Sequence, residues 1–284
     1  MKIKSYFNRM TPSMIVVTIV GLIGSILILS PKMMMIYIPN NEQLNLMKEA
    51  QLYYKGDSNN ILEYSKYILS DNQLTERHYF FTAQLVFLKF AVIFNQLLYS
   101  STEFDIRFLG MTYLGFYLCG LYWLTKVVFP RNTKPKNRIE ALFLGLVAAL
   151  LGGLRYFNSF YNFPVTLITI IYITAACFNL IRLNRVKFEG IFISLLISTS
   201  LLVTNDFKNW WMAGIFFILL CVIVWMRLSD AKKRMYFIAS AFLMMIISGW
   251  ATYHFNNPKN LAVPQNKVQL KNKLSKLPPN KNDF

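Results

Sequence analysis

Long apolar runs alternate with short polar segments along most of the chain. Seven of these runs approach the length of about 20 residues that an α-helix needs to cross the hydrocarbon core of a bilayer. The sequence therefore predicts an all-α, polytopic membrane protein with about seven transmembrane helices. The predicted spans are Met14 to Leu29, Phe104 to Phe129, Ile139 to Leu154, Val165 to Ile181, Phe188 to Val203, Trp210 to Leu228 and Met235 to Tyr253.

An eighth apolar run, Tyr79 to Tyr99, carries polar side chains at Thr82, Lys89 and Gln96. Their seven-residue spacing places these three side chains on one face of a helix, opposite a broad apolar face. We interpret this run as an amphipathic surface helix that lies in the membrane interface or lines a cavity.

Basic residues in the short loops favour this interpretation, because Lys and Arg near the ends of spans favour the cytoplasmic side. If Tyr79 to Tyr99 does not cross, the loops 126–138, 182–187 and 227–234, with five, three and four basic residues, share the side of the amino terminus. We therefore predict that the amino terminus lies inside and that residues 1–254 form one membrane module. The basic, Asn- and Pro-rich tail 255–284 cannot bury a core, and this topology places it outside.

The same topology places ten of the thirteen acidic residues outside, six of them in the loop 31–78. Within this outer loop, we expect one helix from Asn41 to about Tyr54 and a second from Ser58 to about Leu69. Asp57 precedes the second helix, and the partial positive charge at the amino-terminal end of that helix would favour an ionised carboxylate. Carboxylate chemistry is therefore expected in this loop.

Composition agrees with a membrane protein, since hydrophobic residues make up 55% of the chain and charged residues only 15%. Thirty Lys and Arg against thirteen Asp and Glu would elsewhere suggest nucleic acid, but here the basic residues lie between spans, so no nucleic-acid partner is expected. The three cysteines lie inside apolar runs, and His78 and His254 are isolated. Neither a disulfide framework nor a zinc site is indicated.

Two short motifs stand at predicted outer ends of spans: Phe104-Asp105-Ile106-Arg107-Phe108-Leu109-Gly110 and Tyr156-Phe157-Asn158-Ser159-Phe160-Tyr161. With the acidic outer loop and its amphipathic helices, they resemble the GT-C glycosyltransferases, and more closely the bacterial glycan-biosynthesis hexose transferases of that superfamily. The resemblance covers the layout of residues 1–254. It implies seven conserved spans, a sugar donor carried on polyprenyl phosphate, and a catalytic carboxylate in the first outer loop, for which Asp57 is the matching position.

The chemistry implied by this resemblance needs a base for the acceptor hydroxyl and cations for the departing phosphate. Asp57 is the candidate base, and the alternative is that Gly56-Asp57 is only a turn and helix cap. Arg107, Arg155 and Lys89 are candidates for binding phosphate, because their cationic groups match its oxygens. The alternative for all three is that they extend to lipid headgroups.

Sugar recognition has further candidates in the second motif. Asn158, Ser159 and Tyr161 could form an aromatic and amide surface for a sugar, and the alternative is an interfacial aromatic belt. Where the superfamily often has an acid after this motif, the chain reads Asn162-Phe163-Pro164. Asp206 is the candidate to replace that acid, with a solvated turn as the alternative. A divalent metal is left open because the sequence shows no clear site for one.

The sequence thus favours a membrane glycosyltransferase that moves a sugar from a polyprenyl-phosphate-linked donor to a cell-envelope glycan acceptor, outside the bacterial cytoplasmic membrane. The expected partners are this donor, a glycan or lipid-linked acceptor, the lipid bilayer and, given the short chain, a partner subunit. The alternative is a non-catalytic scaffold or partner subunit, or a flippase. A transporter usually carries charge at mid-membrane, and apart from Lys89 none is evident.

Overall fold

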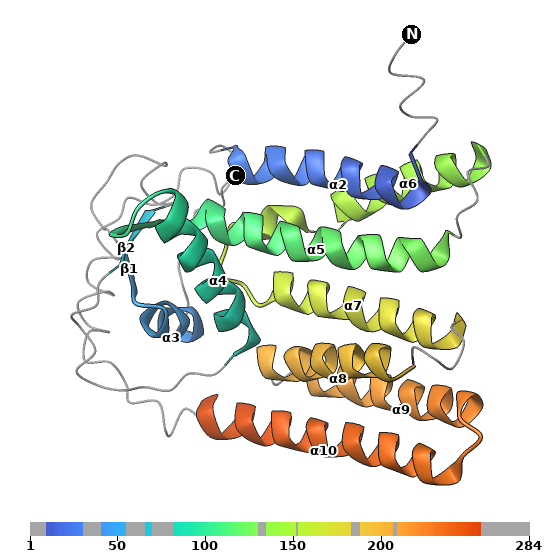
Figure 1. The fold of residues 1–284 in the computed structure, drawn as a ribbon. Coiled ribbons are helices and arrows are strands. Elements are labelled where there is room, and N and C mark those ends of the chain that lie inside the picture. Colours follow the sequence, from blue (N-terminus) through green and yellow to red (C-terminus); the bar gives the residue numbers. More distant parts are fainter. Residues whose placement is uncertain are drawn as a thin grey trace, which may run out of the picture.

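The computed structural model describes residues 10–30, 41–54, 66–69, 82–129, 135–151, 153–182, 188–206 and 209–256. Within these ranges, six helices are long and apolar enough to cross a membrane, and they lie side by side (Figure 1). The predicted mostly helical, polytopic membrane fold is therefore confirmed. The six helices are α2 (Pro12–Leu29), α5 (Ile106–Val128), α7 (Phe163–Arg182), α8 (Phe188–Asn205), α9 (Trp210–Arg227) and α10 (Ala231–Asn256).

The seventh predicted span forms α6 (Pro135–Leu151), which at 17 residues is shorter than the six. It packs along α2 and is followed by the short helix η4 (Leu154–Tyr156). Since α5 and α7 both begin at the left end of the bundle in Figure 1, α6 and η4 return the chain between them. The described residues therefore contain six candidate spans and a shorter return helix, where the sequence predicted about seven spans.

A small antiparallel sheet, which the sequence did not predict, lies at the end of the bundle where α5 and α7 begin (Figure 1). It consists of β1 (Leu52–Tyr54), β2 (Lys66–Leu69) and β3 (Glu103–Asp105), in the order β1-β2-β3. In its register the Cα of Tyr54 pairs with Tyr67, and that of Lys66 with Asp105. We call this end of the bundle the sheet end.

The sheet corrects two predictions for the outer loop. Helix α3 (Asn41–Glu49) begins where expected but ends before β1, and the segment Lys66–Leu69 is a strand instead of helix. Burial with a period of two explains the difference, because Tyr67 is buried and Ile68 is exposed. Tyr67 packs against Phe104 and Phe160, with ring centroids 6.4 and 5.2 Å away. Asp57 lies between β1 and β2, outside the described residues.

Helix α4 (Ala83–Leu98) runs obliquely across the sheet end, and its 16 residues are too few for a candidate span (Figure 1). The three residues of the predicted polar stripe differ in exposure, since Thr82 is buried whereas Lys89 and Gln96 are exposed. The face that packs on the protein instead follows a spacing of four, three and four residues, with polar side chains at its two ends. This buried face contains Gln84, Leu88, Ala91 and Asn95.

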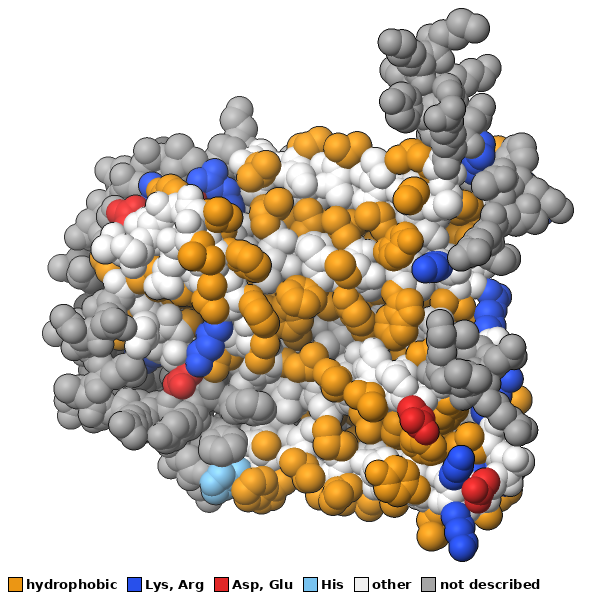
Figure 2. Space-filling view, viewed as in Figure 1, with side chains coloured by type: hydrophobic (Ala, Val, Ile, Leu, Met, Phe, Trp, Pro, Cys, Tyr) orange, Lys and Arg blue, Asp and Glu red, His pale blue; other side chains and the backbone are white. Residues whose placement is uncertain are grey.

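Hydrophobic side chains cover the middle of the molecule, and charged ones gather toward its two ends (Figure 2). At the end opposite the sheet, the last turns of three spans and the first turns of α6 and α10 carry basic residues. These are Lys126, Lys136, Arg138, Arg182, Arg227, Lys232, Lys233 and Arg234. The band between the two ends is the surface expected to face lipid.

Candidate functional site

The sheet end collects most of the described residues that the sequence analysis selected. Arg107 is the second residue of α5, Arg155 lies in η4, and Asp206 directly follows α8. Residues Asn158, Ser159 and Tyr161 lie between η4 and α7 in the chain, and α7 begins at the same end (Figure 1). Tertiary structure thus brings segments about 100 residues apart in the chain to one end of the bundle.

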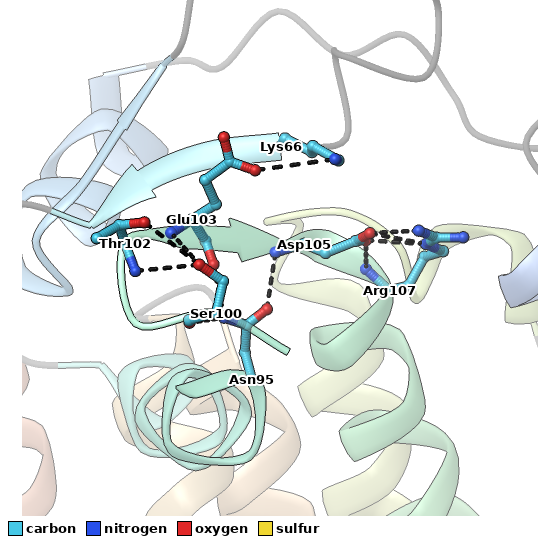
Figure 3. A network of polar contacts seen from close by, with 7 residues as sticks. All are labelled: Lys66, Asn95, Ser100, Thr102, Glu103, Asp105 and Arg107. Carbon is cyan, nitrogen blue, oxygen red and sulfur yellow. Dashed lines mark hydrogen bonds and ion pairs between the residues drawn. The ribbon is translucent and has the colours of Figure 1, made fainter. Parts of the chain in front are cut away.

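A partly buried ion pair between Asp105 and Arg107 marks the start of α5 (Figure 3). Asp105 is the N-cap of α5, and one of its carboxylate oxygens accepts the backbone N–H of Arg107 at 2.9 Å. Nε of Arg107 lies 3.0 and 2.9 Å from the two carboxylate oxygens, and Nη2 donates to Oδ2. The side chain of Asp105 is 2% exposed and that of Arg107 is 35% exposed.

Asn95 of α4 holds the segment that carries this pair (Figure 3). Its Oδ1 accepts the backbone N–H of Asp105 at 2.9 Å, and its Nδ2 donates to the carbonyls of Ser100 and Glu103 at 2.9 and 2.7 Å. Sequence reasoning missed the roles of Asn95 and Asp105. An Asp directly before an apolar helix is an N-cap signal that could have identified Asp105.

Lys66 of β2 adds a second cation to this region. Its Nζ lies 3.8 Å from a carboxylate oxygen of Glu103 and 5.6 Å from the centroid of the Tyr99 ring. A hydrogen bond with Tyr99, followed by the charges of Tyr99, Glu103 and Asp105, raises the pKa of Lys66 above its ordinary value. Lys66 therefore keeps its positive charge throughout the neutral range.

The second motif forms a tight buried turn before α7. Asn158 donates from Nδ2 to the carbonyl of Ile28 at 2.8 Å, and the Ser159 hydroxyl donates to the carbonyl of Tyr156. The Ser159 oxygen also accepts the N–H of Tyr161 at 3.4 Å. Both side chains thus donate to backbone carbonyls of the protein itself. Hydrogen bonds from Asn158 and Ser159 to a sugar stay a prediction.

Aromatic rings and a cation form an exposed surface beside this turn. Tyr156 packs edge-on against Tyr161 and Phe163, with ring centroids 5.9 and 5.7 Å away, and the exposed Arg155 guanidinium lies 5.2 Å from the Tyr156 ring. Tyr161 is 37% exposed. Arg155 and Tyr161 are thus exposed, and their binding of a donor or sugar stays a prediction.

Two long-range hydrogen bonds fix the amino-terminal end of α4 to this region. Thr82 donates from its hydroxyl to the carbonyl of Asn205 at 3.2 Å, and Gln84 donates from Nε2 to the carbonyl of Tyr161 at 3.0 Å. Asn205 in turn donates to the carbonyl of Asn162 at 2.9 Å. We call the bonds made by Thr82 and Gln84 the α4 latches.

Removing a latch is expected to loosen the start of α4. The variant Gln84→Ala loses a buried side-chain hydrogen bond worth about 1 kcal/mol, so backbone amides of residues 84–90 should exchange roughly fivefold faster. Hydrogen exchange followed by mass spectrometry measures this. Gln96→Ala, on the exposed side of the same helix, serves as the control, and equal exchange in both variants would show that the latch does not hold α4.

No group of three or more His, Cys, Asp or Glu side chains that could hold a metal ion occurs in the described part of the chain. His254, at the end of α10, stacks on Trp250 with ring centroids 5.1 Å apart. Asp57 and His78 lie outside the described residues. The described residues therefore offer no such cluster for the divalent metal that the sequence left open.

Comparison with known protein families gives a match over most of the chain. Residues 1–266 match the family model described as "YfdI N-terminal transmembrane domain". Neither a curated protein nor a solved structure matches the chain. The match agrees with the six candidate spans, which make this a multi-pass membrane protein. With nearly the whole sequence covered, the chain belongs to the YfdI N-terminal transmembrane domain family.

Proposed function

We propose that this protein is a membrane glycosyltransferase that moves a sugar from a polyprenyl-phosphate-linked donor to a cell-envelope glycan acceptor, on the outer side of a bacterial cytoplasmic membrane. One observation carries the proposal: the exposed cations and aromatic rings suited to a phosphate-linked sugar share the sheet end. The segment 55–65, which contains Asp57, connects two strands of this sheet, and the second strand begins at Lys66, the Cα partner of Asp105.

The proposed chemistry divides among these residues. Asp57 accepts the proton of the acceptor hydroxyl while the oxygen of that hydroxyl bonds to the anomeric carbon. The bond from the anomeric carbon to the phosphate oxygen breaks. The departing phosphate gains negative charge, which guanidinium groups stabilise by paired hydrogen bonds. Arg107 and Arg155 supply those groups, Tyr161 contributes an exposed ring beside the sugar, and Asp206 lies at the same end.

Charge distribution supports an outward-facing site. The described basic residues at the ends of α5, α7 and α9 lie opposite the sheet end, and Lys and Arg in short loops favour the cytoplasm. The sheet end then faces outward, and the amino terminus lies inside. Because α10 runs toward the sheet end, the tail that follows it starts on the outer side (Figure 1).

The apolar side of α4 supports a lipid-linked donor. Phe87 and Phe90 contact Phe116 of α5, with ring centroids 5.0 and 6.3 Å away, and Phe90, Phe94 and Phe116 are exposed. The lipid-facing surface of the bundle therefore continues onto α4 at the sheet end. A polyprenyl chain in the outer leaflet would lie beside this surface, with its phosphate at the level of the site.

Sugar transfer by the purified full-length protein tests the proposal. The protein is reconstituted in liposomes with a cell-envelope glycan and with polyprenyl-phosphate-linked glucose, galactose or mannose, radiolabelled in the sugar, in separate reactions. We expect label to enter the glycan from one of these donors. Absence of transfer by correctly folded protein with every donor would favour the non-catalytic scaffold instead.

Arg155→Gln provides a site-specific prediction within this assay. Loss of a charge-assisted hydrogen bond to phosphate, worth about 1.5–3 kcal/mol, should reduce kcat/KM for the donor roughly 10-fold or more. Lys233→Gln removes an exposed cation at the opposite end of the bundle and serves as the matched control. An equal effect of the two substitutions would remove Arg155 from the binding site.

A further inference from the structure

The guanidinium of Arg107 has two edges, and Asp105 occupies one of them. Nε and Nη2 donate to the carboxylate, which leaves Nη1 and the second Nη2 proton without a hydrogen bond among the described residues. Figure 3 shows a terminal nitrogen of Arg107 directed away from Asp105. The Arg107 side chain as a whole is 35% exposed, so part of it is open to a ligand.

The orientation of this free edge is fixed by the surroundings of Asp105. The backbone N–H of Asp105 donates to Asn95 Oδ1, and the backbone of Asp105 pairs with Lys66 across the sheet. The Asp105 carboxylate is buried. Asn95 is itself buried and uses its amide hydrogens on the carbonyls of Ser100 and Glu103. A carboxylate held in this way leaves the paired guanidinium little freedom to rotate.

The carboxylate of Asp105 makes more hydrogen bonds than a helix cap requires. An N-cap needs one side-chain oxygen to accept a backbone N–H, and Asp105 meets that need with Oδ1. Its Oδ2 accepts only from the guanidinium of Arg107 among the hydrogen bonds of the described residues. The second oxygen and the negative charge therefore serve to hold Arg107.

We propose that Asp105 is a positioning residue for lipid-phosphate binding. It fixes the Nε–Nη2 edge of Arg107, so that the free Nη1–Nη2 edge forms a ready two-donor site for phosphate oxygens of a polyprenyl phosphate. The inference rests on the proposed function, because that function supplies the lipid phosphate. It adds that Asp105 acts through Arg107 and that Asn95 holds Asp105 in place.

The substitution Asp105→Asn separates positioning from capping. Asn is as good an N-cap as Asp, so the bond to the Arg107 N–H is retained. Asn lacks the charge and the second carboxylate oxygen, so the guanidinium is no longer fixed. Glu103→Gln is the matched control, since it removes another carboxylate of the same network, one that contacts Lys66 instead of Arg107.

Direct binding tests the inference without requiring sugar transfer. The full-length protein in phosphatidylcholine nanodiscs is titrated with undecaprenyl phosphate and, separately, with undecaprenol, and bound lipid is counted by native mass spectrometry. We expect the wild type and Glu103→Gln to prefer the phosphate, and Arg107→Ala to lose most of that preference. Asp105→Asn should bind the phosphate about tenfold more weakly and undecaprenol unchanged, which corresponds to loss of about one charge-assisted hydrogen bond.

The double variant Asp105→Asn/Arg107→Ala should bind no more weakly than Arg107→Ala, because a positioning residue acts only through its partner. Wild-type binding by folded Asp105→Asn, or a wild type that does not distinguish phosphate from alcohol, would overturn the inference. Equal competition by phosphatidate would overturn the assignment to a polyprenyl carrier. Phosphate binding as expected without sugar transfer would instead defeat the proposed function alone.

A second variant covers the outcome in which Asp105→Asn does not fold. Arg107→Lys keeps the positive charge but replaces the two-edged guanidinium with a point charge. We expect phosphate binding to fall five- to tenfold, since Lys cannot contact Asp105 and phosphate through separate edges. Wild-type binding by Arg107→Lys would contradict the proposed geometry.

Discussion

Replacing Asp57 with Asn is expected to reduce sugar transfer at least about 100-fold, because a general base contributes roughly 10²–10⁴-fold to the rate of such a reaction. Asn has nearly the shape of Asp but cannot accept the proton of the acceptor hydroxyl. The same substitution tests the alternative interpretation of Gly56-Asp57 as a turn and helix cap. Asn is equally suited to both of those roles, so that alternative predicts normal transfer.

The measurement is the initial rate of label transfer by the reconstituted protein, with the concentrations of donor and acceptor varied in turn. A lost base should lower kcat while leaving the affinity for undecaprenyl phosphate close to that of the wild type. Asp71→Asn, which removes another acid from the outer loop 31–78, serves as the control. Transfer within threefold of the wild type by Asp57→Asn would exclude Asp57 as the base.

Gly110→Ala is expected to cause the largest loss of stability, about 2–3 kcal/mol, because overpacking of a buried contact and loss of a hydrogen bond combine. A Cβ at position 110 would lie 2.1 Å from Oδ1 of Asn158 and 3.1 Å from Cγ2 of Ile28. Asn158 is buried and cannot turn aside without breaking its bond to the Ile28 carbonyl. The damage would reach the junction of α2, α5 and the turn that carries Asn158.

Thermal unfolding of the purified protein in detergent measures this effect. Gly115→Ala on the same helix is the matched control, since a Cβ there meets no atom within 4 Å and should be neutral or slightly stabilising. The double variant Gly110→Ala/Asn158→Ala should be more stable than the sum of the two single losses predicts, because the shorter side chain makes room. Equal stability of Gly110→Ala and Gly115→Ala would contradict the observed packing.

The fold prediction succeeded where a local pattern is sufficient. Six predicted spans match α2, α5, α7, α8, α9 and α10 within a few residues at most ends, because a lipid-exposed helix needs only length and apolar composition. Helix α4 was also expected, although its seven-residue polar stripe did not identify the buried side. That side was decided by contact with α5, whose position the local sequence does not specify.

The sheet end was less predictable. Lys66–Leu69 has apolar residues compatible with either a helix or a strand, and its pairing with β3 joins residues 35 to 39 positions apart in the chain. Asn95 resembled any polar residue of an amphipathic helix until its contacts with Ser100, Glu103 and Asp105 were seen. Long-range partners of this kind leave almost no trace in a local pattern.

The sequence by itself determined the membrane-spanning architecture, the basic end of the bundle and the candidates Arg107, Arg155 and Tyr161. These features depend on apolar composition, periodicity and charge within short segments, and each segment responds to the lipid or water around it without needing a distant partner. Only the tertiary structure decided that Asn158 and Ser159 serve a buried turn and that Asp105 holds Arg107. Those roles depend on which atoms lie within hydrogen-bond distance, and packing of distant segments sets that distance.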